Sequence, residues 1–202
     1  MLENVIIGLA ITGSFCNFPK VQKLIQDLKK EKAERIIPII SKVYDTRFYE
    51  GEHFLKMLKE ETQEEIVDTI VKAEPIGPKN IVDIILVVPC TGNTIAKLAN
   101  GITDTPVTMA VKSHIRNNKP VLIGVSTNDG LGVNLKNIGV LLDTKNFYFI
   151  PFRQDDYINK PKSLVLDYDK VIESTKLALD KKQIEPLLVW QISHHNIYFY
   201  WW

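Results

Sequence analysis

The stretch from Pro89 to Thr94, with the sequence PCTGNT, combines residue types that can bind a flat polar ligand. It follows an apolar run and precedes the helical pattern IAKLAN, so it lies where a strand gives way to a helix. Thr91, Asn93 and Thr94 carry hydrogen-bonding side chains, and Gly92 lets another group come close to the backbone. The residue types alone leave two interpretations open, a ligand-binding loop or a polar cap for the following helix.

A second polar loop, GLAITGSF over residues 8–15, follows the first apolar run. Gly13 permits close approach to the backbone, while Thr12 and Ser14 place hydroxyl groups at the start of a predicted helix. The free N–H groups of a helix N-terminus bind anions such as phosphate. The loop has neither the G-x-G-x-x-G pattern nor the G-K-[ST] of a P-loop, so it is either an ordinary strand–helix turn or a phosphate site.

Polar residues also follow two other apolar runs. Ser41 comes directly after IIPII, and the segment VSTNDGLGVN (125–134) places Ser126 and Asn128 beyond another run. Asp129 in that segment is interpreted as a cap for the next helix. Because the carboxyl ends of parallel strands meet at one edge of a sheet, we expect these polar loops to converge.

Apolar runs and helical patterns alternate along the whole chain. The runs show no alternation of polarity, which is typical of strands buried on both faces of a parallel sheet, and they are VIIGLAI (5–11), IIPII (36–40), DIILVVP (83–89), PVLIGV (120–125) and FYFIP (147–151). The apolar helical stripes are Val21, Leu24, Ile25 and Leu28; Val107, Ala110, Val111, His114 and Ile115; Leu131, Leu135, Ile138 and Leu142; and Val171, Thr175, Ala178 and Leu179. This order predicts an α/β fold, a three-layer αβα Rossmann-like (doubly wound) parallel sheet in a single domain.

Three residues predict where helices begin and end. Pro19 lies in the first turn of one helix, and Thr105 is placed to cap another that begins at Pro106. Gly101 follows the helical pattern after the PCTGNT loop, where a left-handed residue commonly ends a helix.

Composition excludes several classes of function. The 25 Lys and Arg residues against 24 Asp and Glu residues give a net charge of +1, which provides no field to attract nucleic acid or an acidic membrane. Cys16 and Cys90 are too few for a disulfide framework and favour a reducing, cytoplasmic location. No set of His, Cys, Asp and Glu residues has the spacing of a metal site, and Cys90 is interpreted as a small buried side chain. We assign the domain to residues 1–189 and regard the aromatic-rich segment 190–202 as a tail outside it.

Taken together, GLAITGS, PCTGNTIAKLANGITDTPVTMA and STNDGLG resemble the flavoprotein family that includes phosphopantothenoylcysteine decarboxylase and the flavin prenyltransferases. The resemblance covers roughly residues 4–189. It is strongest to the branch that oxidises dihydrodipicolinate to dipicolinate during sporulation. It implies an FMN-binding oxidoreductase subunit that forms homo-oligomers built from trimers and acts with an A subunit of the NAD(P) type.

The resemblance also implies which residues bind the cofactor. Carried over by position, the groups that hold the FMN phosphate and ribityl chain are Thr12, Gly13, Ser14 and Ser41. The groups around the isoalloxazine ring are Pro89, Cys90, Thr91, Gly92, Asn93 and Thr94. Ser126 and Asn128 from the later loop are further cofactor-binding candidates. On this view the PCTGNT loop is polar because it bonds to the ring, and Gly92 is small because the ring passes close to the backbone.

Catalytic residues are less well defined. A small dicarboxylate substrate needs cationic or backbone contacts, and our candidates are Lys112 and Asn93, with a solvated Lys112 as the alternative. The cysteine decarboxylases of the family carry an Asn-His-Ile segment that corresponds here to EPIGPK (74–79), which has no histidine. Three interpretations stay open: a subunit that oxidises dihydrodipicolinate with a partner, a homomeric flavin decarboxylase or prenyltransferase, and a non-catalytic flavin-binding subunit.

Overall fold

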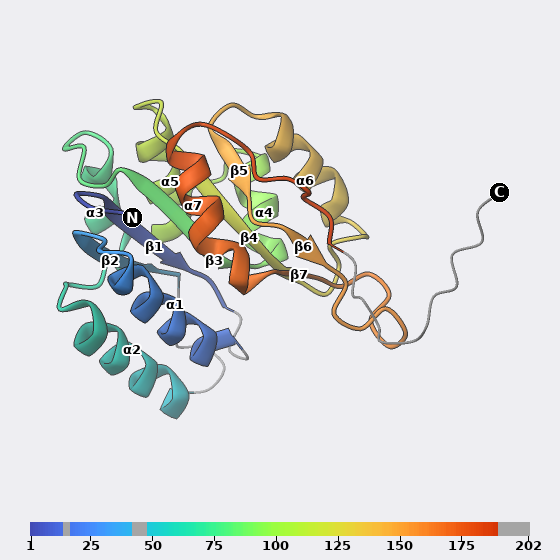
Figure 1. Cartoon of the computed structure of the whole chain (residues 1–202), viewed down its shortest axis with the longest axis horizontal. Helices are drawn as coiled ribbons and strands as arrows, with labels where there is room; N and C mark the ends of the chain where they lie inside the picture. Colours follow the sequence, from blue (N-terminus) through green and yellow to red (C-terminus); the bar gives the residue numbers. More distant parts are fainter. Residues whose placement is uncertain (14–16, 42–47, 190–202) are drawn as a thin grey trace.

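The computed structural model describes residues 1–13, 17–41 and 48–189 (Figure 1). Its strands are β1 (Ile6–Ile11), β2 (Arg35–Ile40), β3 (Ile84–Cys90), β4 (Val121–Thr127), β5 (Phe147–Phe149), β6 (Phe152–Arg153) and β7 (Leu164–Leu166). Its α-helices are α1 (Phe18–Lys30), α2 (Phe48–Thr62), α3 (Ile70–Ala73), α4 (Gly92–Ala99), α5 (Pro106–Ile115), α6 (Asn134–Asp143) and α7 (Val171–Leu179), and two short 3-10 helices are η2 (Glu74–Ile76) and η3 (Tyr168–Lys170). The five predicted strands and the predicted helices all form, with ends that move by a few residues.

The strands form one sheet of seven strands in the order β2-β1-β3-β4-β7-β6, with β5 paired to β4 off this path. Strands β1 to β5 pair in parallel, as predicted for a Rossmann-like fold. The sheet is mixed rather than purely parallel, because β7 runs antiparallel to β4 and to β6. The first half of β4 pairs with β5 and its last two residues pair with β7, so the β6–β7 pair extends the sheet at the carboxyl end of β4.

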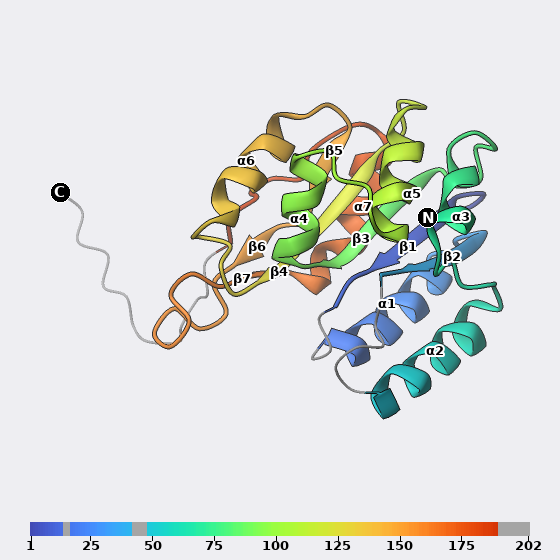
Figure 2. The ribbon, with the colours of Figure 1, turned by 180° about the vertical axis from the view of Figure 1, so that it is seen from behind.

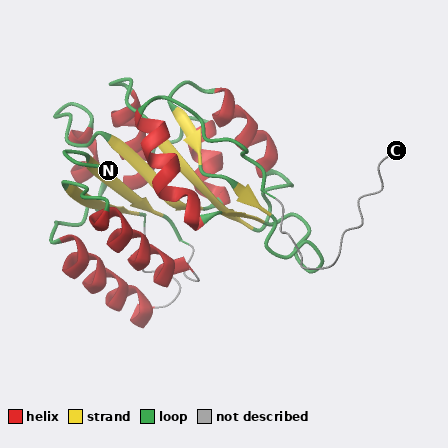
Figure 3. Ribbon diagram, in the orientation of Figure 1, coloured by secondary structure: helices red, strands yellow, loops and turns green. Residues whose placement is uncertain are grey.

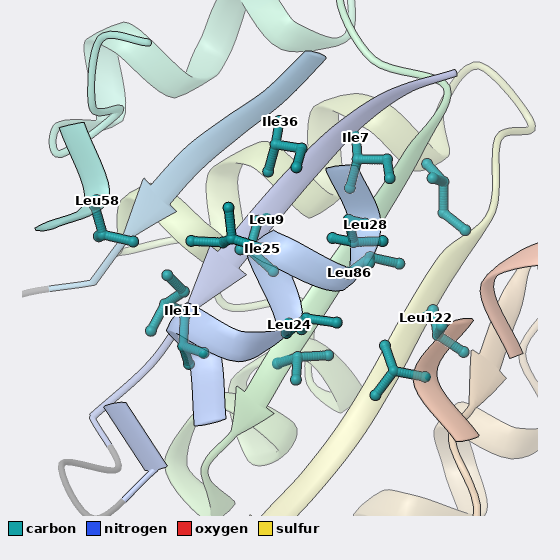
Figure 4. Packing of buried hydrophobic residues seen from close by; sticks show 14 of the residues in the cluster. Ile7, Leu9, Ile11, Leu24, Ile25, Leu28, Ile36, Leu58, Leu86 and Leu122 are labelled. Carbon is teal, nitrogen blue, oxygen red and sulfur yellow. The ribbon is translucent and has the colours of Figure 1, made fainter. Parts of the chain in front are cut away.

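Helices cover both faces of the sheet (Figure 3). Helices α1, α2 and α7 lie on one face (Figure 1), and α3, α4, α5 and α6 lie on the other (Figure 2). Alternate residues of β1 point to the two sides, so Leu9 packs beneath α1 and α2 whereas Ala10 packs toward α4 and α5. Figure 4 shows the first of these layers, in which Leu9 and Leu86 meet Ile25 and Leu28 of α1. Burying each such side chain stabilises the fold by about 1.5–3 kcal/mol.

The predicted helix boundaries are confirmed. Pro19 lies in the first turn of α1. Thr105 caps α5 in a reciprocal pair with Thr108, whose backbone N–H donates to the Thr105 hydroxyl at 3.2 Å. Gly101, with φ of +69°, follows the end of α4 in the left-handed conformation.

The predicted apolar face of α6 is wrong. Leu131, Leu135 and Leu142 are exposed, and of the predicted stripe only Ile138 is buried. The helix instead buries Asn134 and Asn137, together with Ile138 and Leu141. A polar network at the start of the helix, described below, holds these two amides inside. No helix in the described part of the chain is both long and apolar enough to cross a bilayer.

Candidate functional site

The carboxyl ends of the parallel strands bring the predicted polar loops to one edge of the sheet. Strands β1 and β3 are neighbours there, yet the helices that follow them, α1 and α4, cover opposite faces. This arrangement is a topological switch point, where open α/β sheets bind their ligands. Two hollows open at this edge, one on each face, and both are lined by Gly13, Thr91, Gly92 and Thr127.

Thr12 joins the two strands at the switch point. Its hydroxyl donates to the Pro89 carbonyl oxygen at 2.9 Å and accepts from the Thr91 backbone N–H at 2.9 Å. The residue is 1% exposed, and its single hydroxyl proton is already used. Thr12 therefore positions the PCTGNT loop against β1 and keeps no donor for a ligand.

The hollow on the side of α4 and α5, which we call the α4-side hollow, has a volume of about 830 Å³. Of the predicted cofactor residues it is lined by Thr12, Gly13, Ser41, Thr91, Gly92, Asn93 and Thr94. The Thr91 and Thr94 hydroxyl oxygens lie 3.2 Å apart, and Thr91 makes no side-chain bond to the α4 backbone. The polar side chains of this loop are thus not used to cap α4, which removes one of the two interpretations drawn from the sequence.

Gly92 is small because the protein itself packs against it. A Cβ atom at this position would lie 2.5 Å from the Asn134 amide nitrogen, 2.7 Å from the Thr127 hydroxyl and 2.8 Å from an Asp129 carboxylate oxygen. These distances are shorter than any ordinary contact, so a side chain would displace its neighbours. This packing is a reason for glycine that the sequence did not indicate, and the expectation that a flat ring passes close to Gly92 stays a prediction.

Asp129 is the centre of the network that packs against Gly92. Its carboxylate accepts a hydrogen bond from the Thr127 hydroxyl at 2.5 Å and from the Asn134 amide at 3.0 Å to each oxygen. Asn137 in turn donates to the Asn134 side-chain oxygen at 2.9 Å. The hydrogen bond from Thr127, followed by that from Asn134, holds the pKa of the Asp129 carboxyl below its ordinary value. Asp129 therefore stays ionised beside the first residue of α4, where the helix dipole favours negative charge.

The expected cap role of Asp129 is corrected by the same observations. The N-cap position of α6 is Val133, which has no side chain able to accept from the helix. We did not predict from the sequence that these residues form a network. Asn134 and Asn137 are nevertheless one helical turn apart and follow Asp129 closely in the chain. That spacing is the signal that could have found it.

The other charges of the α4-side hollow are paired. Lys97 lies 2.9 Å from Asp104, and the Lys97 hydrogen bond lowers the pKa of the Asp104 carboxyl. An Asp68 carboxylate oxygen lies 2.8 Å from the Lys72 ammonium nitrogen, four residues further along the chain. Within the described lining, the groups left for a ligand are hydroxyls, amides and backbone atoms rather than free charges.

The remaining predicted residues lie elsewhere. Pro89 and Cys90 are buried in β3 and line neither hollow, and burial strongly raises the pKa of the Cys90 thiol, so it stays protonated. Ser126 and Asn128 line the hollow on the opposite face. Ser14 falls outside the described residues. The Lys112 side chain is exposed and lines neither hollow, so the structure does not bring this catalytic candidate to the edge.

The segment EPIGPK (74–79), which the sequence analysis matched to the family's Asn-His-Ile motif, also lies away from the hollows. Gly77 in that segment packs against α5 near Ser113, and its backbone N–H donates to the Ser113 hydroxyl at 3.2 Å. Neither Glu74 nor Lys79 lines either hollow. Among the residues that the structure describes, no group of three or more His, Cys, Asp and Glu side chains could hold a metal ion.

Comparison with known proteins identifies the family of the chain. The family model described as Flavoprotein matches residues 1–175. The chain belongs to the Flavoprotein family. It is 46% identical over 186 residues to the B subunit of dipicolinate synthase of Bacillus subtilis (strain 168), over 91% of this chain and 92% of that protein.

Solved structures share the fold of this chain. The crystal structure of the B subunit of dipicolinate synthase from Bacillus halodurans C is 40% identical, with a TM-score of 0.86 over 95% of this chain and 99% of that chain. The FMN-dependent cysteine decarboxylase SpaF is 17% identical, with a TM-score of 0.67 over 89% of this chain and 98% of that chain. The second likeness supports the fold alone.

The α4-side hollow fits the flavin that membership of the Flavoprotein family implies. Its volume of about 830 Å³ is that of a cofactor site. The Ser41 hydroxyl oxygen is buried at its wall and has no hydrogen-bond partner among the described residues. A buried hydroxyl of this kind is stabilised by a ligand that bonds to it. Ser41, Thr91, Asn93 and Thr94 are therefore the residues that would hold a flavin here.

Proposed function

We propose that the protein is the FMN-binding subunit of a dipicolinate synthase, which oxidises dihydrodipicolinate to dipicolinate together with an A subunit during sporulation. The observation that carries this proposal is the α4-side hollow at the β1–β3 switch point. Its hydroxyl and amide lining suits a flat ring edged with heteroatoms, because its own charges are already paired. The 46% identity to the B subunit of a dipicolinate synthase supports the choice of reaction.

FMN is favoured because Gly13, the last described residue after β1, offers a place for its phosphate. Gly13 lines the hollow at the point where the chain turns toward the N-terminus of α1. A phosphate at that end would meet the partial positive charge of a helix, whereas the start of α4 already carries the Asp129 carboxylate. This asymmetry supports a phosphate beside Gly13 and a ring beside Thr91 and Asn93.

The residues of the chain bind and orient, and bound FMN supplies the acceptor for the two electrons that leave the dihydropyridine. Thr91 and Thr94 offer hydroxyls to the polar edge of a ring, and Asn93 adds an exposed amide. An amide has no titratable proton near neutral pH, so Asn93 positions a ligand rather than acting as an acid or base. The Asp129 network holds these groups in place through Gly92.

We also propose that copies of the chain assemble with each other, in units of three as the resemblance predicts. An exposed aliphatic surface on and before α6 supports a contact between copies, and it consists of Leu131, Val133, Leu135, Val140 and Leu142. Light scattering after size-exclusion chromatography would measure the mass. A monomer at micromolar concentration would contradict this part of the proposal.

The decisive experiment has two parts. The visible spectrum of the purified protein, with and without added FMN, is expected to show bound flavin in about equimolar amount. Dihydrodipicolinate is then added with and without an A-type partner, and dipicolinate is followed by its ultraviolet absorbance. We expect dipicolinate to form faster with both subunits present than with either subunit alone.

Each alternative outcome has a distinct meaning. A protein that does not bind flavin contradicts the proposal at its first step. Full activity without the partner would show a homomeric enzyme, and no effect of this protein on its partner would show a non-catalytic subunit.

A further inference from the structure

The hollow on the opposite face, which we call the α1-side hollow, contains a cation that the proposed function does not use. The hollow has a volume of about 990 Å³ and lies between α1 and the β6–β7 pair. It meets the α4-side hollow along the shared rim formed by Gly13, Thr91, Gly92 and Thr127. A molecule bound in it would therefore lie next to a ring held by the PCTGNT loop.

Strand register places the side chain of Arg153 in this hollow. Val165 of β7 pairs with Ser126 of β4 on one side and with Arg153 of β6 on the other. Side chains at directly opposed positions point to the same face of a sheet, and this row faces α1. The Asn17 amide, at the start of α1, donates to the Ser126 hydroxyl at 3.1 Å from that same face. Arg153, Ser126 and Asn17 thus form one wall of polar groups along the end of the sheet.

Arg153 differs from the other cations of the α1-side hollow. It is half-buried and makes no ion pair with any described residue, whereas Lys23, Lys30 and Lys160 are exposed and Lys30 also lies 2.8 Å from Asp27. Lys20 is exposed and lies over the Tyr168 ring at 5.1 Å. The neighbouring acid Asp155 is exposed and leaves the guanidinium unpaired. A partly desolvated, unpaired guanidinium is suited to bind a planar carboxylate through two parallel hydrogen bonds.

We propose that Arg153 binds a carboxylate of the planar dicarboxylate substrate in the α1-side hollow, with the substrate ring directed toward the rim at Thr91 and Gly92. This inference rests on the proposed function, which supplies the substrate class. It replaces Lys112, the cation expected from the sequence, by one that lies at the edge where the flavin site is. The Ser126 hydroxyl and the Asn17 amide on the same wall restrict where the ring and its second carboxylate can lie.

The test measures the binding of dipicolinate and of FMN to variants of the full chain. Arg153→Gln removes both the positive charge and the paired N–H donors of the guanidinium, which we call the fork, and Arg153→Lys keeps only the charge. Arg116→Gln is the matched control, because Arg116 is exposed just beyond α5 and lines neither hollow. FMN binding is followed by quenching of flavin fluorescence, and dipicolinate binding by calorimetry on the FMN-loaded protein.

We expect Arg153→Gln to weaken dipicolinate binding by about 10- to 100-fold, since a hydrogen bond to a charged group is lost. FMN affinity should change by less than about twofold in all variants, and Arg116→Gln should match the parent chain. Arg153→Lys should recover only part of the loss because the ammonium cannot form the fork. Picolinate, which has one carboxylate, should bind more weakly than dipicolinate to the parent chain, and Arg153→Gln should reduce this preference.

Two results would overturn the inference. The first is dipicolinate binding that is absent from the FMN-loaded parent chain or is equal in the parent, Arg153→Gln and Arg116→Gln. The second is a parallel loss of FMN, dipicolinate and thermal stability in Arg153→Gln with full recovery in Arg153→Lys, which would show that Arg153 only supports the β6–β7 pair. In the first case FMN binding still tests the proposed function separately.

Discussion

The two hollows at the carboxyl edge differ in how their polar groups are used. In the α4-side hollow Lys97 pairs with Asp104, Asp68 pairs with Lys72 beside the hollow, and Asp129 is held by Thr127 and Asn134. In the α1-side hollow Arg153 has no acidic partner among the described residues. The difference shows that one edge of a sheet can provide, on one face, a pre-arranged surface whose charged groups are already bonded within the protein, and on the other face a free charge. The first suits a cofactor that stays bound, and the second suits a charged substrate that must leave.

Glycine substitutions at the rim shared by the two hollows should have the largest effects. Gly92→Ala places a Cβ against Asn134, Thr127 and Asp129, so we expect the free energy of unfolding to fall by about 1–3 kcal/mol and FMN binding to fall with it. A Cβ on Gly13 meets no atom of the described residues within 4 Å. Gly13→Ala should therefore leave the unfolding midpoint unchanged and weaken FMN binding alone.

Urea unfolding and flavin titration on the same two variants would check this prediction. A Gly92→Ala protein with unchanged stability would contradict the packing that the structure assigns to Gly92. A Gly13→Ala protein with unchanged FMN affinity would show that the phosphate does not approach this turn.

Much of the fold could be predicted from the sequence, because buried parallel strands leave long apolar runs between turn residues. The ends of α1, α4 and α5 were predictable for a similar reason, since Pro19, Gly101 and Thr105 act through local backbone chemistry. The edge of the sheet was predictable because the polar loops come after the strands. These features depend on residues close together in the chain.

Features that depend on contacts between distant loops could not be predicted. The face of α6 was assigned to its leucines, whereas the hydrogen bonds of Asp129 bring Asn134 inside. The antiparallel β6–β7 pair is only a few residues long and leaves no periodic pattern, so Arg153 was missed. Lys112 was a candidate because it follows a helix that starts near the PCTGNT loop, but α5 leaves its side chain exposed and away from both hollows.

Removal of the Asp129 carboxylate should have the second largest effect on the α4-side hollow. Asp129→Ala leaves the buried Asn134 amide and the Thr127 hydroxyl without their acceptor, which should cost about 1–3 kcal/mol of stability. Asp129→Asn keeps the shape and one acceptor and should cost less. FMN affinity should fall in the same order, since Gly92 and the PCTGNT loop rest on this network.

The pH dependence of unfolding gives an independent check on Asp129. Because hydrogen bonds lower its pKa in the folded state, the stability it contributes is present above the ordinary aspartate pKa and is lost as the pH falls through the lowered value. Asp129→Asn should therefore reduce the loss of stability at the acid end. If the variant and the parent chain lost stability equally as the pH fell, the result would argue against an ionised Asp129.

His114 provides a contrast from outside both hollows, where the pH should act on stability without acting on the site. Its side chain is 1% exposed, its Nε2 lies 3.1 Å from the Pro120 carbonyl oxygen, and burial lowers its pKa to about 4. Nearby Lys119 also lowers this pKa, and Asp83 opposes the effect. The stability held by the neutral ring is present above the ordinary pKa and is lost as the pH falls from about 6.5 toward 4, by up to about 3 kcal/mol.

Thermal unfolding of the parent chain and of His114→Leu between pH 7.5 and 4.5 would measure this loss. The variant should show a flatter profile, and its FMN affinity at pH 7.5 should equal that of the parent chain. A change in FMN affinity at neutral pH would show that the two ends of the sheet are coupled, which the packing described above does not predict.

Removal of residues 190–202 should have the smallest effect of all these changes. The segment 190–202 lies outside the described residues, and the aromatic composition of the sequence predicts a tail outside the domain. Phe152 of β6 donates its N–H to the Leu187 carbonyl at 3.0 Å, and its own carbonyl accepts from the Val189 N–H at 3.2 Å. A chain ending at Val189 keeps both bonds, so its melting temperature and flavin content should match those of the full chain.

A chain ending at Pro186 loses both bonds and the half-buried Leu187, which should lower the free energy of unfolding by about 1–3 kcal/mol. It should also bind dipicolinate more weakly, because Arg153 follows Phe152 in β6. If the chain ending at Val189 also lost flavin or stability, the tail would belong to the folded structure and the domain boundary at residue 189 would be wrong.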